Sequence, residues 1–283
     1  MGLFTEKKVE MKPKTQLPDN KDKILLVDAD TVAYSVAVMI EELVEEYEDD
    51  MGNLQQEYHL DLDLATEISV QKIQDMLEST GCKAAELHFT GGRSESFRRL
   101  IYPPYKEDRD GTRTPERLMD LKKKLCEEFP NSQIHTKWEA DDYVVWAMKE
   151  YSYKYVLAAV DKDVLNSVPG KHWNYYANSK YKIQPKWVEV DEITSLKWPY
   201  IQTLTGDSTD NIPGLHRVGP KTAEKLLKGQ EFHWEMWKIV VEEYEKRGKT
   251  VDDALLTMRL VNMHQLEMVD NKLQINLFNI SND

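Results

Sequence analysis

The chain has 283 residues, enough for one large domain or two modest ones, and it is 41% hydrophobic and 10% aromatic, as is typical of a folded soluble protein. No stretch approaches the roughly 20 apolar residues that a membrane-spanning helix needs, so no membrane association is expected. Only two cysteines, Cys82 and Cys126, are present, which excludes a disulfide scaffold and indicates a reducing compartment. The formal net charge of −13 argues at first sight against a nucleic-acid partner.

The distribution of charge weakens that objection. Thirteen acids and one basic residue lie between Glu41 and Glu78, so one segment carries nearly the whole excess of negative charge. By contrast, residues 93–125 contain ten Lys or Arg and six acids, and residues 211–228 contain four Lys or Arg and one acid. Charges more than about 10 Å apart are largely screened at ordinary salt, so these local basic segments can attract phosphates.

In chain order, residues 1–22 are polar and predict a flexible N-terminal arm without a secretory signal. Residues 23–190 then alternate apolar runs with stretches of helical spacing. The runs typical of strands are Lys23–Ala29, Ala84–Thr90, Ser132–Thr136 and Lys154–Val160. The helical stretches are Thr31–Glu46, Leu60–Ser79, one that begins at Thr114, and Ala140–Tyr151. Strands separated by helices predict parallel crossovers and a three-layer α/β domain.

After about residue 191 the strand signals stop. Four helical stretches follow, at Glu192–Leu204, Lys221–Lys228, Trp234–Lys246 and Asp252–Met263. We therefore expect residues 191–283 to form a helical region packed on the α/β domain.

Acidic residues gather where the predicted strands end. Four segments contribute them: Asp28 and Asp30; Glu139, Asp141 and Asp142; Asp161 and Asp163; and Asp207 and Asp210. Because the chain has 50 acids, any single pair is more often a solvated surface pair. The carboxyl ends of parallel strands meet at one edge of a sheet, however, so three of these groups are expected to converge.

Carboxylates that converge repel one another, and bound cations would relieve that repulsion. Two carboxylates 4 Å apart repel by about 4 kcal/mol at an effective dielectric constant near 20. A set of ligands made only of oxygen suits Mg²⁺ or Mn²⁺ and does not indicate zinc. Two such ions can orient a water and stabilise the entering and leaving oxygens of a phosphodiester, so the implied chemistry is phosphoryl hydrolysis.

The segment Asn211–Leu227 has the pattern of a helix-hairpin-helix. Gly214 and Gly219 permit tight turns, Pro220 begins the second helix, and Lys221 adds a positive charge beside it. A phosphate placed against free amides of this turn would be bound without base readout, so Gly214, Gly219 and Lys221 are candidate DNA contacts. The alternative is an ordinary helical hairpin.

Residues 93–125 interleave basic and aromatic side chains, including Arg98 and Tyr105. Charge and stacking together suit a nucleic-acid single strand, so both residues are candidate DNA contacts. A solvated loop followed by an exposed helix face is an equally good interpretation of composition alone.

Taken together, these residues resemble the 5′-nuclease superfamily, specifically its phage and bacterial 5′–3′ exonuclease and flap endonuclease branch. The resemblance covers about residues 23–230, and its motifs occur in a fixed order. They are Val27-Asp28; Phe97-Arg98 with Pro104-Tyr105-Lys106 and Arg109; Glu139-Ala140-Asp141-Asp142; Asp161 with Asp163; and Gly206-Asp207 with Asp210-Asn211-Ile212 and Gly214. The resemblance implies a PIN-like three-layer domain with a mainly parallel sheet, a helical arch at about 93–127 and a helix-hairpin-helix at about 207–228.

The resemblance also implies roles for individual residues. Two Mg²⁺ or Mn²⁺ ions would be held, in part through water, by Asp28, Glu139, Asp141, Asp142, Asp161, Asp163, Asp207 and Asp210. Lys106 and Arg109 would be catalytic cations near the scissile phosphate, Tyr105 would stack on a base, and K⁺ is common in the hairpin turn. The implied partner is DNA with a 5′ single-stranded end or flap, bound by a monomer in the cytoplasm, or in that of the host if the gene is a phage's.

One departure from the family concerns Gly91. Related enzymes usually carry an acid after the second strand, where this chain has Phe89-Thr90-Gly91-Gly92. Glu95 or a water is a candidate substitute, and Asp30 lies where family sequences vary. The acidic segment 41–78 is interpreted as an insertion or an enlarged helical layer.

Three alternatives stay open at this stage. The enzyme could prefer RNA in RNA–DNA duplexes, as an RNase H does. The chain could instead be a non-catalytic DNA-structure binder with a decayed metal site, which the glycine at position 91 favours. A small PIN-type ribonuclease is disfavoured because such proteins lack the hairpin and the arch-like segment.

Overall fold

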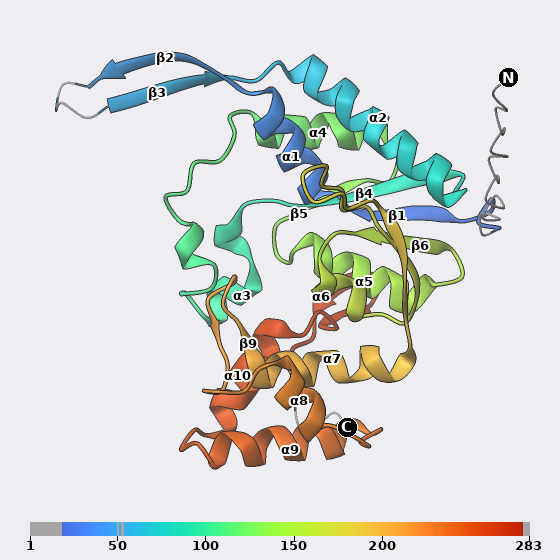
Figure 1. The fold of residues 1–283 in the computed structure, drawn as a ribbon, viewed down its shortest axis with the longest axis vertical. Coiled ribbons are helices and arrows are strands. Elements are labelled where there is room, and N and C mark those ends of the chain that lie inside the picture. Colours follow the sequence, from blue (N-terminus) through green and yellow to red (C-terminus); the bar gives the residue numbers. More distant parts are fainter. Residues whose placement is uncertain (1–18, 50, 52–53, 280–283) are drawn as a thin grey trace, which may run out of the picture.

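The computed structural model describes residues 19–49, 51 and 54–279, so most of the expected arm at 1–22 lies outside the described residues. A six-stranded sheet in the order β5-β4-β1-β6-β7-β8 forms the centre (Figure 1). All pairings are parallel except that of β8 with β7. The strands are β1 (Ile24–Asp28), β4 (Ala84–Thr90), β5 (Gln133–His135), β6 (Tyr155–Ala159), β7 (Gly170–Asn174) and β8 (Lys186–Val190). The predicted α/β class is confirmed, whereas β7 and β8 had not been expected.

Alternation along β1 explains the three layers. Leu25 and Val27 face one core and Leu26 faces the other, since successive side chains of a strand point to opposite faces. The helices α1 (Asp30–Ile40), α2 (Leu62–Thr80) and α4 (Leu118–Glu128) supply the first core. The helices α5 (Ala140–Tyr151) and α6 (Lys162–Asn166) supply the second. Figure 1 shows α1, α2 and α4 on one side of the sheet and α5 on the other.

The C-terminal helices build a separate core. They are α7 (Glu192–Thr205), α8 (Pro220–Leu226), α9 (His233–Glu245) and α10 (Val251–Val261). Tyr200 and Tyr244 are fully buried there, and the Tyr244 hydroxyl donates to the Thr203 carbonyl at 2.8 Å. No helix among the described residues is long and apolar enough to cross a membrane.

The expectation that strands end near residue 191 is wrong. Two short ladders follow: β9 (Gly206–Asp207) with β10 (Ile212–Pro213), and β11 (Leu266–Val269) with β12 (Lys272–Ile275). Leu266 and Met263 pack into the core beneath α5, so the chain returns to the α/β layers after α10. Asp270 and Asn271, both with positive φ, form the two-residue turn of the β11–β12 hairpin, and Leu273 and Ile275 alternate with polar residues along β12. The sequence therefore carried a local strand signal here.

The acidic segment is also corrected. The expected helix Thr31–Glu46 ends at Ile40, and residues beyond it form a hairpin of β2 (Glu42–Glu48) and β3 (Leu54–His59). A helix here would place Glu41 beside Glu45 and Glu42 beside Glu46 at i,i+4 spacing, where like charges repel. Along an extended strand these i,i+4 pairs lie further apart, although the hairpin register places Glu45 opposite Glu57. Residues 42–59 therefore form an exposed β-hairpin that projects from α1 and α2 (Figure 1).

The arch-like segment connects β4 to α4. It contains η1 (Arg93–Glu95), α3 (Phe97–Ile101) and η2 (Glu107–Arg109). The helix expected to begin at Thr114 begins instead at Leu118. Glu41 explains the delay, because its carboxylate accepts from the Arg113 side chain and, at 2.6 Å, from the Glu116 amide.

Candidate active site

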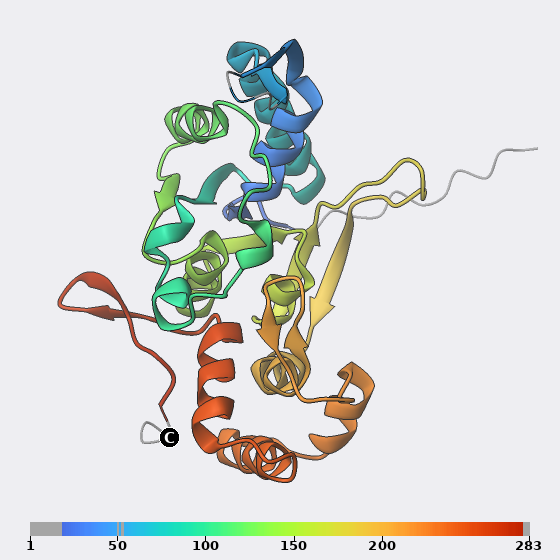
Figure 2. The same cartoon turned by 90° about the vertical axis from the view of Figure 1, so that its left-hand side faces the viewer.

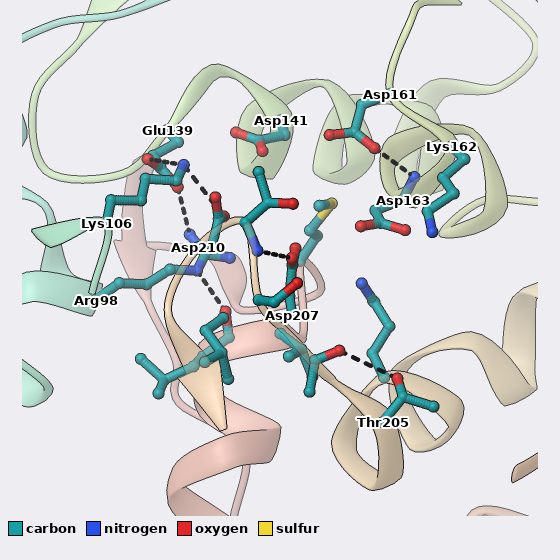
Figure 3. Close-up of a pocket in the computed structure, with 18 of the residues that line it drawn as sticks. Arg98, Lys106, Glu139, Asp141, Asp161, Lys162, Asp163, Thr205, Asp207 and Asp210 are labelled. Carbon is teal, nitrogen blue, oxygen red and sulfur yellow. Dashed lines mark hydrogen bonds and ion pairs between the residues drawn. The ribbon is translucent and has the colours of Figure 1, made fainter. Parts of the chain in front are cut away.

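A cavity of about 580 Å³ opens at the carboxyl edge of the sheet, where it is bounded by α7 and the turn between β9 and β10. Seven of the eight acids expected to bind metal line it: Asp28, Glu139, Asp141, Asp161, Asp163, Asp207 and Asp210. Figure 3 shows acids from α5, α6 and the β9–β10 turn gathered around one space. The predicted convergence of strand-end carboxylates therefore occurs.

Local backbone structure holds several of these acids in place. Asp28 is the last residue of β1. Asp161 is the N-cap of α6, and its carboxylate accepts from the Asp163 amide at 2.8 Å. The Asp207 carboxylate accepts from the Thr209 amide at 2.8 Å, which tightens the turn after α7.

For the acids on the side of β1 and α6, burial and mutual repulsion outweigh the attraction of the nearby lysines Lys106 and Lys162. Burial, followed by repulsion from Asp30 and Asp161, raises the pKa of Asp28 to about 8. Burial and the neighbouring Asp161 raise the pKa of Asp163 to about 7. Oδ1 of Asp163 is buried and has no hydrogen-bond partner among the described residues. These acids are buried and repel one another, and one of their oxygens lacks a hydrogen-bond partner. A bound cation would relieve the repulsion and accept that oxygen as a ligand.

The opposite side of the cavity carries the positive charge. Lys106 Nζ lies 2.7 Å from Glu139 Oε1 and 3.4 Å from Asp210 Oδ2. Arg109 pairs with the other oxygen of Asp210 at 2.7 Å. Although burial favours the neutral form, Lys106 and Arg98 hold the pKa of Glu139 at about 2. Two cationic side chains, Lys106 and Arg109, thus lie beside the acids, where a phosphate could bind to them.

The donor chemistry of the cavity fits Mg²⁺ or Mn²⁺, because every acidic ligand presents oxygen and Asp163 offers an unsatisfied one. In the part of the chain that the structure describes, no three His, Cys, Asp or Glu side chains are arranged to hold an ion. Ion binding would therefore require some of these side chains to rotate toward a shared point, with Lys106 released from Glu139.

Three expected site residues form a buried support instead of a binding surface. The Arg98 guanidinium makes a two-point contact with Asp142 at 2.6 and 2.7 Å and also donates to the carbonyls of Leu260 and Asn262. Asp142 is fully buried and does not line the cavity. Tyr105 is 4% exposed, and its hydroxyl donates to Glu139 Oε2 at 2.6 Å. Arg98 and Tyr105 are buried and paired with acids, yet both line the cavity. Their DNA contacts and metal ligation by Asp142 stay predictions.

The structure explains the glycine where related enzymes carry an acid. A Cβ at Gly91 would lie 2.8 Å from the His135 carbonyl oxygen, so β5 closes over this position. Glu95 is exposed and does not line the cavity. Asp30 lines it, and its carboxylate accepts from the Thr90 amide at 3.0 Å and from Lys122 at 2.7 Å.

Asp30 therefore brings a carboxylate to the end of β4 without a side chain at position 91. Sequence reasoning left it outside the proposed ligand set. The available signal was its two-residue spacing from Asp28 at the end of the same strand, the spacing shown by Asp161 and Asp163.

The helix-hairpin-helix candidates lie in two different environments. Gly214 packs on the chain after α7, where a Cβ would lie 2.0 Å from the Thr205 carbonyl oxygen. Its absent side chain permits this close backbone approach, and a contact of its backbone with DNA stays a prediction. Gly219 caps α8 and is exposed, as are Arg217 and Lys221 nearby. These three remain available to a partner.

No protein-family model matches the chain. In sequence it is similar to DNA polymerase I of Treponema pallidum, with 31% identity over 145 residues, which is 47% of this chain and 14% of that protein. DNA polymerase I of Lactococcus lactis is 26% identical over 235 residues, 76% of this chain and 24% of that protein. The chain thus spans a quarter or less of the length of these two relatives.

Solved structures share the fold. A flap endonuclease of bacteriophage T5, in a complex with DNA and metal ions, has a TM-score of 0.59 at 14% identity, covering 85% of this chain and 89% of that one. The catalytic core of Rad2 with a DNA substrate has a TM-score of 0.51 at 14% identity, covering 93% of this chain and 85% of that one. The likeness to these solved structures confirms the fold that the motifs implied.

Proposed function

We propose that this chain, which has the fold of the 5′-nuclease superfamily, is a divalent-metal-dependent nuclease that hydrolyses DNA at 5′ single-stranded ends or flaps. One observation carries the proposal. Eight carboxylates, Asp30 among them, line a single cavity at the carboxyl edge of the sheet, and Lys106 and Arg109 line it with them. Acids that could hold cations, placed beside cations that could hold a phosphate, are the combination that phosphodiester hydrolysis needs.

The acids on the β1 and α6 side are the proposed metal ligands. Asp28, Asp141, Asp161 and Asp163 would hold Mg²⁺ or Mn²⁺ together with Asp207. A bound divalent ion supplies an activated water and neutralises charge on the phosphate. Asp30 joins this set as the carboxylate at the end of β4, held there by Thr90 and Lys122.

Lys106 and Arg109 are the proposed phosphate-binding cations. Both are paired with Glu139 or Asp210, so neither carries an unopposed charge before substrate arrives. A phosphodiester entering the cavity would replace these carboxylates as the hydrogen-bond acceptor of Lys106 and Arg109. Glu139 and Asp210 would then be freed to turn toward the metal side. Tyr105, whose hydroxyl bonds both acids, would position them and would not stack on a base.

The α8 turn is the proposed anchor for DNA outside the cavity. Arg217 and Lys221 are exposed on it, and the Gly219 backbone beside them is open. Contacts of this kind hold the sugar–phosphate backbone regardless of sequence. A monovalent cation such as K⁺ in this turn belongs to the same proposal.

The test is cleavage of a 5′-flap DNA labelled at both ends, in Mg²⁺, by the wild-type chain and Asp161→Asn. We expect the wild type to cut near the junction and the variant to lose cleavage while it binds DNA in Ca²⁺ with unchanged affinity. Cleavage retained by the variant would contradict the proposed centre. A wild type that binds the flap but never cuts it would support the non-catalytic alternative, and preferential cutting of an RNA strand in a hybrid would support the RNase H-like one.

A further inference from the structure

Between η2 and α4 the arch-like segment has no regular structure. In the described part of the chain, the hydrogen bonds that residues 113–116 make to residues outside 109–121 all end on Glu41. The Arg113 side chain donates to one oxygen of the Glu41 carboxylate, and the Glu116 amide donates to the other at 2.6 Å. This stretch of the segment is therefore hydrogen-bonded to the rest of the protein through a single carboxylate.

Glu41 is itself held in place. It directly follows α1, its amide donates to the Ala37 carbonyl at 2.9 Å, and its side chain is 1% exposed. Tyr58 of β3 contacts the same arginine, whose guanidinium carbon lies 3.5 Å from the centre of the Tyr58 ring. The base of the acidic β2–β3 hairpin thus contacts Arg113 through a carboxylate and an aromatic face.

The stretch held by Glu41 forms one wall of a cavity that adjoins the candidate active site. This cavity has a volume of about 990 Å³, and Arg113, Thr114 and Pro115 line it. Lys106 and Arg109 line both this cavity and the candidate active site. Five basic and three acidic side chains surround the cavity, a balance that suits a phosphate backbone. Figure 2 shows the stretch, in green, running beside α1, in blue, on its way to α4.

We infer that Glu41 and Tyr58 are positioning residues, which hold residues 113–116 as a preformed wall for the single-stranded part of the substrate. An irregular wall that became ordered only when the strand entered would weaken binding, since the loss of conformational freedom opposes association. A wall held in advance avoids that loss. The base of the β2–β3 hairpin therefore contributes to the affinity for a single strand through this wall. The inference rests on the proposed nuclease function, since that function supplies the strand.

Limited proteolysis with trypsin tests the wall without any cleavage of DNA. Trypsin cuts after Arg113 only when the backbone around it opens, so the rate reports how firmly residues 113–116 are held. We expect Glu41→Ala to raise the rate of cutting after Arg113 about tenfold, measured by mass spectrometry of the fragments. The matched control is Glu45→Ala, which removes an exposed acid of the same hairpin, opposite Glu57, and should follow the wild type. An unchanged rate in Glu41→Ala would overturn the inference.

The aromatic contact has its own pair of variants. Tyr58→Ala should also speed cutting after Arg113, but only about threefold, because Glu41 still holds the arginine. Tyr47→Ala removes a tyrosine of the same hairpin that is 49% exposed, and it should match the wild type. Equal rates in Tyr58→Ala and the wild type would refute the role of Tyr58.

Cleavage kinetics in Mg²⁺ then test the role in substrate binding. For Glu41→Ala we expect the KM for a 5′-flap DNA to rise about fivefold, with kcat within about twofold of the wild type and an unchanged KM for a nicked duplex without a flap. Glu41→Gln keeps an oxygen that can accept from the Glu116 amide and should restore part of the affinity. A purely structural role would lower Tm and raise the KM for both substrates alike, and that result would contradict the inference. A wild type that cuts neither substrate would refute the nuclease proposal instead, and the trypsin rates would still decide whether Glu41 holds the wall.

Discussion

Arg98 and Asp142 form a two-point ion pair of 2.6 and 2.7 Å beneath the candidate active site, with both side chains almost completely buried. The pair joins α3 of the arch-like segment to the first turn of α5. It also fixes Glu139, since Asp142 Oδ2 accepts from the Glu139 amide at 3.0 Å. The pair therefore supports the carboxylate that meets Lys106.

Truncating one partner of this pair should destabilise the protein strongly. We expect Asp142→Ala to lower the free energy of unfolding by about 3–5 kcal/mol, because the buried Arg98 loses its two-point partner and keeps only Glu139, 3.6 Å away. The double variant Arg98→Met with Asp142→Leu should lose less than the sum of the single changes. Urea unfolding measures all three. The neighbouring exposed pair Arg99–Asp110 is the control, and Asp110→Ala should cost about 1 kcal/mol or less.

Restoring an acid at position 91 should harm the protein. Gly91→Asp would force a Cβ to within 2.8 Å of the His135 carbonyl oxygen, so we expect a loss of about 1–3 kcal/mol in the free energy of unfolding. Gly92→Asp adds the same charge one residue later, where a Cβ meets nothing within 4 Å, and should be tolerated. Equal unfolding midpoints for the two variants in urea would contradict the packing argument.

Lys106 should contribute more to kcat than to the affinity for DNA. Lys106→Met removes a charge placed beside the reacting phosphate, and we expect kcat to fall roughly 10²–10³-fold while the Kd for flap DNA in Ca²⁺ changes little. Lys123→Met, an exposed lysine of α4, is the matched control and should leave kcat unchanged. A Kd that rises as much as kcat falls would show that Lys106 only binds substrate.

Mg²⁺ should stabilise the fold by relieving repulsion among the buried acids. An ion held at 100 times its Kd adds about 2.7 kcal/mol to the free energy of unfolding. The increase in Tm on adding Mg²⁺ should be large for the wild type and reduced in Asp163→Asn. In EDTA at pH 8 the variant should be more stable than the wild type, because one buried carboxylate is gone. Equal Tm shifts with Mg²⁺ would place the ion away from Asp163.

Low pH should lower the free energy of unfolding through the buried pair His88 and His135. Burial, then the positive charge of His135, lowers the pKa of His88 to about 3, and burial lowers that of His135 to about 4. Unfolded histidine has a pKa near 6.5, so below that pH the unfolded state binds protons that the folded state refuses. Each such group costs up to about 1.4 kcal/mol per pH unit as the pH falls from 6.5 toward 4, and nothing above 6.5.

The histidine effect is isolated by comparison with His88→Leu, because Asp28 and Asp163 have raised pKa values and give the opposite slope. Between pH 6.5 and 4.5 the free energy of unfolding in urea should fall more steeply for the wild type than for the variant. His59→Leu alters an exposed histidine and should follow the wild type. Parallel curves for wild type and His88→Leu would refute the assignment.

The sequence by itself determined the elements that short-range patterns of apolar and polar residues control. The apolar runs that became β1, β4 and β6, and the acids that end β1 and begin α5 and α6, follow from periodicity and from the geometry of parallel strands. The like-charged stretch after Ile40 misled the same reasoning, because helical spacing alone does not show that this stretch pairs with residues 54–59 as a hairpin.

Tertiary structure decided which acids face the cavity and which groups surround them. Asp141 and Asp142 are adjacent in sequence, yet Asp141 lines the cavity and Asp142 is ion-paired with Arg98, a residue 44 positions away. Asp30 reaches β4 only because Thr90 and Lys122 hold it there. Such pairings join residues distant in the chain, and burial sets their energies, so periodicity and spacing carry no signal of them.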